Sequence, residues 1–125
     1  MMEANLDLYR REFLKGSTKT LLLSLLVDEP MYGYQLVKEM EKRSSGYFRF
    51  KEGTLYPALH RLEANGLVEG RWDMSPNGQN RRYYHITPKG RPKLASMLEE
   101  WSLFTRAVNL VAGRSEVSTL GVPEV

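Results

Sequence analysis

The residues of this chain best suited to chemistry lie close together, between positions 54 and 61. They supply a hydroxyl, a phenol, an imidazole, a guanidinium and a rigid proline, and they are Thr54, Tyr56, His60, Arg61 and Pro57. These groups donate and accept hydrogen bonds, and the guanidinium also pairs with anions. A surface that only needs solvation usually carries Glu and Lys instead. We therefore interpret the cluster as a surface for phosphates and the edges of nucleic-acid bases.

A single helix within residues 51–68 can position this cluster. Four apolar residues recur at spacings of three and four, which places them on one side of a helix: Leu55, Ala58, Leu59 and Leu62. The polar cluster falls on the other side. Pro57 is expected in the first turn, where the missing N–H has no intrahelical partner in any case. Asn65 and Gly66 suit a left-handed cap at the end of the helix.

Catalytic and metal-binding constellations are not apparent. The chain has no Cys and two His, and neither His60 nor His85 has a nearby nucleophile or a pair of carboxylates. No metal-ligand cluster and no phosphate-binding glycine loop is present in the sequence. The sequence therefore predicts neither an enzyme nor a cofactor, and it supplies no candidate catalytic or metal-ligating residue.

Composition describes an ordinary globular protein, with 42% hydrophobic and 26% charged residues among 125. The longest apolar run, residues 21–27, is far shorter than the roughly 20 residues of a membrane span. The N-terminus does not resemble a signal peptide, because acidic residues come early and no apolar segment follows directly. With no Cys, the chain is expected to be cytoplasmic and to have no membrane partner.

Charge is distributed unevenly along the chain. Residues 42–93 hold 11 Lys and Arg against 4 Asp and Glu, a surplus of +7, whereas the remainder carries −4. Such segregation favours a polyanionic partner for the middle of the chain. Chance clustering on a solvated surface is the alternative interpretation.

The order of elements can be read from periodicity and breakers. A short helix at residues 5–15 is expected to end at Gly16, with Ser17 or Thr18 capping a buried helix at residues 20–27. A third helix at residues 34–43 and a short strand at 47–50 precede the helix described above. A hairpin follows, with strands 67–73 and 81–87 around a loop that contains Asn77 and Gly78. The last helix begins at Pro88 or Arg91 and ends near position 111.

This order is that of an α+β, mainly α, winged helix-turn-helix domain with an added N-terminal helix and a C-terminal helix. The expected divisions are an N-terminal helix at 1–16, the winged domain at 17–87, the C-terminal helix at 88–112 and a tail at 113–125. The helix at 51–68 would enter the major groove, and the hairpin, the wing, would lie along the backbone or minor groove. A small α+β domain whose hairpin merely covers the core remains the alternative.

Three segments resemble the signature segments of the PadR family of bacterial transcriptional regulators. They are PMYGYQL at 30–36, KEGTLYPALHRLE at 51–63 and RYYHITPKG at 82–90. The resemblance covers roughly residues 18–101, and its GTLYP run is the most specific part. It implies a dimeric repressor that binds a pseudo-palindromic operator in double-stranded DNA. In that family the winged domain contacts DNA, the C-terminal helix dimerises, and some members respond to phenolic acids or planar aromatic drugs.

Carried over by position, the resemblance places Thr54, Tyr56, Pro57, His60 and Arg61 on the recognition helix. Tyr34 begins the preceding helix, where its hydroxyl could reach a phosphate. Lys51 is expected to contact phosphate, or else to be a solvated lysine. Arg81 and Arg82 point to opposite faces of a strand, so only one of these two candidates is expected to reach DNA.

A long apolar stripe on the last helix is the candidate for assembly and effector binding. It comprises Leu94, Met97, Leu98, Trp101, Phe104, Val108 and Val111. One interpretation has Trp101 simply packed in a dimer core. The other has two symmetry-related Trp101 rings flanking a pore for a planar aromatic, as in multidrug-sensing PadR-like proteins. Leu6 and the two further ligand candidates Tyr9 and Phe13 would then pack against the partner's last helix.

The hypothesis from the sequence is a ligand-responsive transcriptional repressor that binds DNA as a homodimer. The alternative is a winged-helix protein-interaction module without DNA binding. Such a module would favour an acidic or apolar exposed helix face, and Thr54, His60 and Arg61 argue against it.

Overall fold

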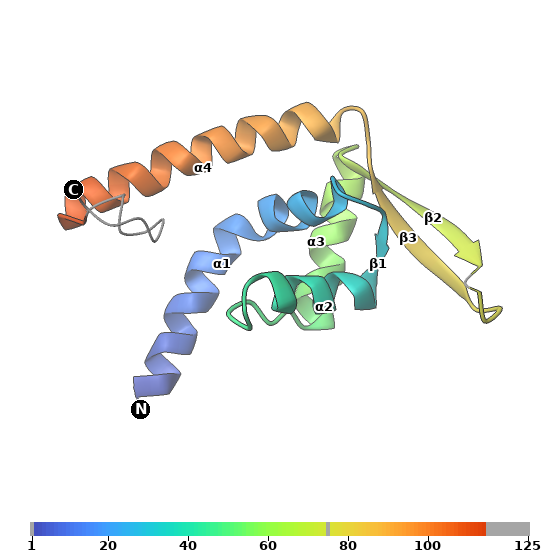
Figure 1. Ribbon diagram of the computed structural model, residues 1–125, viewed down its shortest axis with the longest axis horizontal. Coiled ribbons are helices and arrows are strands. Elements are labelled where there is room, and N and C mark those ends of the chain that lie inside the picture. Colours follow the sequence, from blue (N-terminus) through green and yellow to red (C-terminus); the bar gives the residue numbers. More distant parts are fainter. Residues whose placement is uncertain (1, 75, 115–125) are drawn as a thin grey trace. The chain divides into compact units, whose positions relative to one another are not determined.

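The chain consists of four helices and a small antiparallel sheet in the computed structural model, which describes residues 2–74 and 76–114 (Figure 1). The elements are α1 (Met2–Leu26), β1 (Met31–Tyr32), α2 (Gly33–Arg43), α3 (Glu52–Ala64), β2 (Val68–Met74), β3 (Asn80–Ile86) and α4 (Gly90–Ala112). The mainly helical α+β winged helix-turn-helix class predicted from the sequence is confirmed. The expected tail, apart from its first two residues, and the side chain of Leu6 lie outside the described residues.

Two compact units divide the chain, Met1–Leu94 and Ala95–Val125. The first holds the winged domain together with the whole of α1 and the first turn of α4. Its core is made of aliphatic side chains from the three helices α1, α2 and α3, each at most 3% exposed: Leu22, Leu23, Leu26, Leu36, Met40, Leu55, Leu59 and Leu62. Burying these side chains is the main source of stability for the unit.

The expected break in the N-terminal helix does not occur, and α1 runs without interruption through Gly16. Ser17 and Thr18 do not cap a new helix, because their hydroxyls donate back to the carbonyls of Phe13 (3.1 Å) and Leu14 (2.7 Å). One glycine costs a helix only about 1 kcal/mol relative to alanine. The buried leucines that follow offset that cost.

The third strand lies elsewhere than the sequence predicts. Residues 47–50 form no strand, because Ser45 and Gly46 take positive φ angles of 53° and 82° and turn the chain away after α2. The strand is Met31–Tyr32, which pairs antiparallel with β3 through Met31↔Tyr84 and Tyr32↔Tyr83. The sheet order is therefore β1-β3-β2. The wing is thereby tied to the start of α2.

The junction between the wing and α4 is closely packed. Thr87 caps α4, since its hydroxyl accepts a hydrogen bond from the Gly90 N–H (3.0 Å) and donates one to the Gly66 carbonyl (2.6 Å). The helix thus begins at Gly90, between the two starts expected from the sequence, Pro88 and Arg91. Because α4 begins at Gly90, Pro92 falls in its first turn, where no intrahelical donor is needed.

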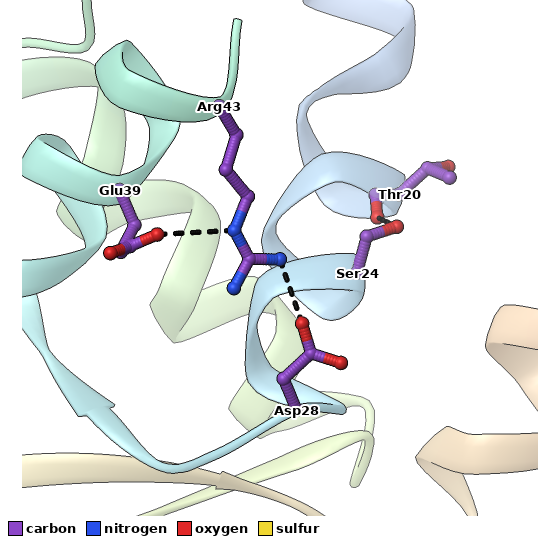
Figure 2. Close-up of polar contacts among 5 residues, drawn as sticks. All are labelled: Thr20, Ser24, Asp28, Glu39 and Arg43. Atoms are coloured by element: carbon purple, nitrogen blue, oxygen red, sulfur yellow. Dashed lines mark hydrogen bonds and ion pairs between the residues drawn. The ribbon is translucent and has the colours of Figure 1, made fainter.

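An ion-pair bridge joins the ends of α1 and α2. Arg43 in the last turn of α2 donates to Asp28, just after α1 (2.7 Å), and to Glu39 one turn back (3.1 Å), as Figure 2 shows. The hydrogen bond to Asp28 is the largest cause of a raised pKa for Arg43. This solvent-exposed bridge links the end of α2 to the turn that follows α1.

Candidate nucleic-acid interface

Helix α3 has one buried and one exposed face, as predicted. Leu55, Ala58, Leu59 and Leu62 are at most 1% exposed. The members of the polar cluster are all exposed: Thr54, Tyr56, Pro57, His60 and Arg61. The buried leucines therefore present the cluster on the outer surface of the winged unit.

The start of α3 differs from the expectation. The helix begins at Glu52 with Lys51 as its N-cap, so Pro57 is an interior residue rather than a first-turn residue. Pro57 has no N–H to donate to the carbonyl of Gly53, four positions earlier. The helix continues through it because its other side is anchored in the core. Gly66, with φ of 75°, ends α3 in the left-handed conformation that the sequence suggested.

No side chain caps the N-terminus of α3. The N–H groups of Thr54 and Leu55 donate to the Lys51 carbonyl (2.9 Å each). An external acceptor would therefore use the N–H groups of Glu52 and Gly53, where the helix dipole favours an anion. Lys51 is exposed beside them. The arrangement can bind a phosphate oxygen.

Tyr56 connects α3 to the start of α2. Its ring end lies directly against Gly33, and a Cβ at that position would overlap the phenolic oxygen. A larger residue in place of Gly33 would therefore force the Tyr56 ring to shift. Only 36% of Tyr56 is exposed, so the fold itself holds this ring at the edge of the exposed face.

Tyrosines and cations form a second cluster around the N-terminus of α2. Tyr34 is 60% exposed, and its ring stacks on Tyr32 at 6.5 Å. Lys38 lies 5.3 Å from the centre of the Tyr34 ring, and the Arg81 guanidinium lies 4.4 Å from that of Tyr32. The sequence did not suggest this grouping, because it depends on the pairing of β1 with β3.

Arg81 and Arg82 have different environments, in agreement with their expected opposite directions. Arg81 covers Tyr32 and donates to Gln79 (3.2 Å). Arg82 donates to Glu63 of α3 (2.6 Å), and the same carboxylate accepts the N–H of Gly70 (3.1 Å). Arg82 is thus engaged within the fold and joins the wing to α3.

The remaining charges of the wing lie on strand β2. Arg71 donates to Glu69 (2.9 Å), and this hydrogen bond lowers the pKa of the Glu69 carboxyl. Pairing reduces the repulsion that Glu69 would exert on a polyanion. His85 is half-buried in β3.

The second unit carries the candidate ligand residues of α4. Trp101 and Phe104 are 45% and 60% exposed, and their rings stack at 5.9 Å. Met97 is half-buried, while Val108 is 47% exposed. A single copy therefore leaves most of the stripe uncovered by its own unit. In the first unit, Tyr9 and Phe13 are likewise 57% and 71% exposed.

Within residues 2–74 and 76–114 the structure has neither a metal-binding cluster nor a membrane-spanning helix. Those residues contain no group of three or more His, Cys, Asp or Glu that could hold a metal ion. No helix in the same part of the chain is long and apolar enough to cross a membrane.

Comparisons with known proteins agree with this arrangement. The model of the transcriptional regulator PadR-like family matches residues 22–96. The chain is 32% identical over 111 residues to the transcriptional regulator Rv3488 of Mycobacterium tuberculosis, covering 89% of this chain and 98% of that protein.

Solved structures give the same result. A PadR family transcriptional regulator from Eggerthella lenta superposes with a TM-score of 0.77 at 30% identity, covering 89% of this chain and 95% of that one. A PadR-like regulator from Bacillus cereus superposes with a TM-score of 0.72 at 32% identity, covering 83% and 99%. These neighbours are transcriptional regulators, not enzymes.

Proposed function

Because this chain belongs to the transcriptional regulator PadR-like family, we propose that it represses transcription by binding a pseudo-palindromic operator as a homodimer. The observation that carries the proposal is the exposed face of α3. It presents Thr54, His60 and Arg61 to solvent, and its uncapped N-terminus faces the same surroundings. A transcriptional regulator of this bacterial family acts on chromosomal DNA, which lies in the cytoplasm. A cytoplasmic location is therefore part of the proposal.

The recognition helix is proposed to lie in the major groove, which is about 12 Å wide and admits a helix. Arg61 and His60 would read base edges, and Thr54 and Tyr56 would contact the strand at the groove edge. Lys51 and Tyr34 would bind phosphate oxygens. Arg81 would do so from the wing, because Arg82 is held by Glu63.

A homodimer is proposed for two reasons. One copy of α3 offers too few base contacts for a specific site, whereas two copies about one DNA turn apart read two half-sites. In addition, the stripe on α4 exposes large apolar side chains, among them Trp101, Phe104, Val108 and Val111. An apolar stripe of this length is typical of a subunit interface.

The effector is proposed to be a small planar aromatic or phenolic molecule. The stacked pair of Trp101 and Phe104 is an aromatic surface on which such a molecule can lie. Met97 supplies an adaptable apolar neighbour on the same helix, and Tyr9 and Phe13 of α1 are the further candidates. Binding between two copies of α4 would change the spacing of the two recognition helices.

DNA binding is tested with labelled duplexes taken from the region upstream of the protein's own gene. His60→Ala and Arg61→Ala should each weaken binding about tenfold, and Arg61→Ala should in addition relax specificity at one base pair. Lys93→Ala removes one charge from the exposed start of α4 and serves as the matched control. Unchanged affinity for both α3 variants at moderate salt would show that the recognition helix is misassigned.

Assembly and effector binding need separate measurements. Sedimentation should give twice the mass of the 14.4 kDa chain. Planar dyes should quench tryptophan emission of the wild-type protein, and Trp101→Ala should lose most of the dye affinity. Equal dye affinity in the two proteins would refute the effector proposal. It would have no bearing on the proposed DNA binding.

A further inference from the structure

The two faces of the wing differ in chemistry towards its tip. Residues that are directly paired in an antiparallel ladder point to the same face. The register pairs Gly70 with Tyr84, Trp72 with Arg82 and Met74 with Asn80. One face therefore carries Trp72 and Met74, while the alternating residues Glu69, Arg71 and Asp73 lie on the other.

The face with Trp72 is the one directed towards α3. Arg82, the partner of Trp72 in the ladder, reaches Glu63 of α3, and Tyr84 on the same face is buried at 2% exposure. The hairpin extends beyond the helices of its unit (Figure 1). The base of this face is consequently core, and its outer part is not covered by the helices of the unit formed by residues 2–94.

Two large apolar side chains occupy that outer part. Trp72 is 69% exposed and Met74 is 65% exposed. Removing an apolar side chain from water is favourable, and neither Trp72 nor Met74 gains this free energy in the isolated chain. Two such side chains together on a projecting hairpin indicate a surface that another molecule covers. Arg82 and Glu63 fix the direction of this surface relative to the recognition helix.

Charge and continuity identify the occupant. The acidic residues of strands β2 and β3, Glu69 and Asp73, lie on the opposite face, and residues 76–80 of the tip contain no acidic side chain. The surface also continues on the side of α3, the element proposed to enter the major groove. An occupant that is apolar yet bordered by anions fits both observations. The walls of the DNA minor groove consist of deoxyribose C–H groups between phosphates.

We propose that Trp72 and Met74 form an apolar wing surface that packs against deoxyribose in the minor groove beside the recognition helix. The proposal rests on the proposed DNA binding and adds a contact that reads groove width and deformability rather than base edges. Because the contact is apolar, it should contribute to affinity without releasing counterions.

The test uses the fact that the chain has two tryptophans. The emission of Trp72 is isolated as the difference between wild type and a Trp72→Phe variant, which retains Trp101. Duplexes are first selected from random sequence with the wild-type protein, and their binding is followed by anisotropy of a label on the DNA. At saturation, acrylamide quenching of Trp72 should fall several-fold, and the emission should shift in wavelength or intensity.

A mutational arm separates this contact from phosphate contacts. Trp72→Ala should lose roughly tenfold in affinity with an unchanged slope of log affinity against log salt, and Trp72→Phe should recover part of the loss. Lys51→Ala is the contrasting control, because Lys51 is proposed to bind phosphate and its loss should reduce the slope by about 1. Trp72 is exposed, so circular dichroism should show that both wing variants keep the fold.

Three outcomes would overturn the proposal. Saturating DNA could leave acrylamide access to Trp72 unchanged, or Trp72→Ala could bind with wild-type affinity. Trp72 could instead become protected as protein concentration rises without DNA, which would assign the surface to self-association. Absence of any anisotropy change with the wild-type protein is a different result, since it would remove the proposed DNA binding itself.

Discussion

The carboxylate of Glu63 joins α3 to the wing, and the cost of its removal can be estimated from its two hydrogen bonds. It accepts two hydrogen bonds, one from the Arg82 guanidinium at 2.6 Å and one from the Gly70 N–H at 3.1 Å. Glu63→Gln keeps an oxygen for Gly70 but removes the charge that faces Arg82. Glu63→Ala removes both. The two variants therefore divide the contribution of Glu63 into a charged and a neutral part.

The charged part is modest because both side chains are partly exposed, 30% for Glu63 and 37% for Arg82. A buried charge-assisted bond contributes about 1.5–3 kcal/mol, and solvent screening reduces this to about 1 kcal/mol here. The neutral bond to Gly70 adds about 1 kcal/mol. We expect Glu63→Gln to lower the free energy of unfolding by about 1 kcal/mol and Glu63→Ala by about 2 kcal/mol.

Urea denaturation at one fixed protein concentration measures these differences, since any assembly of the folded chain also contributes to stability. The dependence on urea should keep its slope. Glu99→Gln, on the exposed surface of α4, is the matched control and should stay within about 0.5 kcal/mol of wild type. If both Glu63 variants also fall within that range, the carboxylate does not join α3 to the wing in solution.

Two further predictions concern the sheet and its junction with α4. Gly90→Ala would place a Cβ against the backbone carbonyl of Leu67, which cannot move aside as a flexible side chain could. Thermal denaturation should therefore show a free energy of unfolding that is lower by about 1–3 kcal/mol. An unchanged melting temperature would mean that this junction is looser than described. Burial raises the pKa of Tyr84, so the stability that its neutral form contributes should be complete below the ordinary value of 10.0 and be lost as pH rises through the higher folded value. Chemical denaturation of wild type and Tyr84→Phe across this range checks the sign, and a wild-type stability that rises relative to Tyr84→Phe would refute it.

Local elements could be predicted from the sequence where the apolar residues of one helix or hairpin recur with a regular spacing. The leucines of α3, the cap at Gly66 and the turn at Asn77-Gly78 each depend on residues a few positions apart, and the exposed face of α3 followed from them. The charge surplus of residues 42–93 likewise needed only counting.

Boundaries that depend on packing were not accessible in this way. Gly16 suggests a break, yet α1 continues because the following leucines are buried in a core shared with α2 and α3. The third strand was expected at 47–50, whereas β1 is only two residues long and exists because β3 pairs with it. Nothing within residues 31–32 alone encodes that pairing.

Only the tertiary structure decided which cations and aromatics act within the fold and which face outward. Arg82 and Glu63 are 19 positions apart, and their ion pair arises because the wing folds back beside α3. Trp72 and Met74 lie on the same face of the hairpin as Arg82 but nearer its tip, and they remain exposed. Side-chain periodicity specifies the face of an element, but the surroundings of that face depend on contacts between residues distant in the chain.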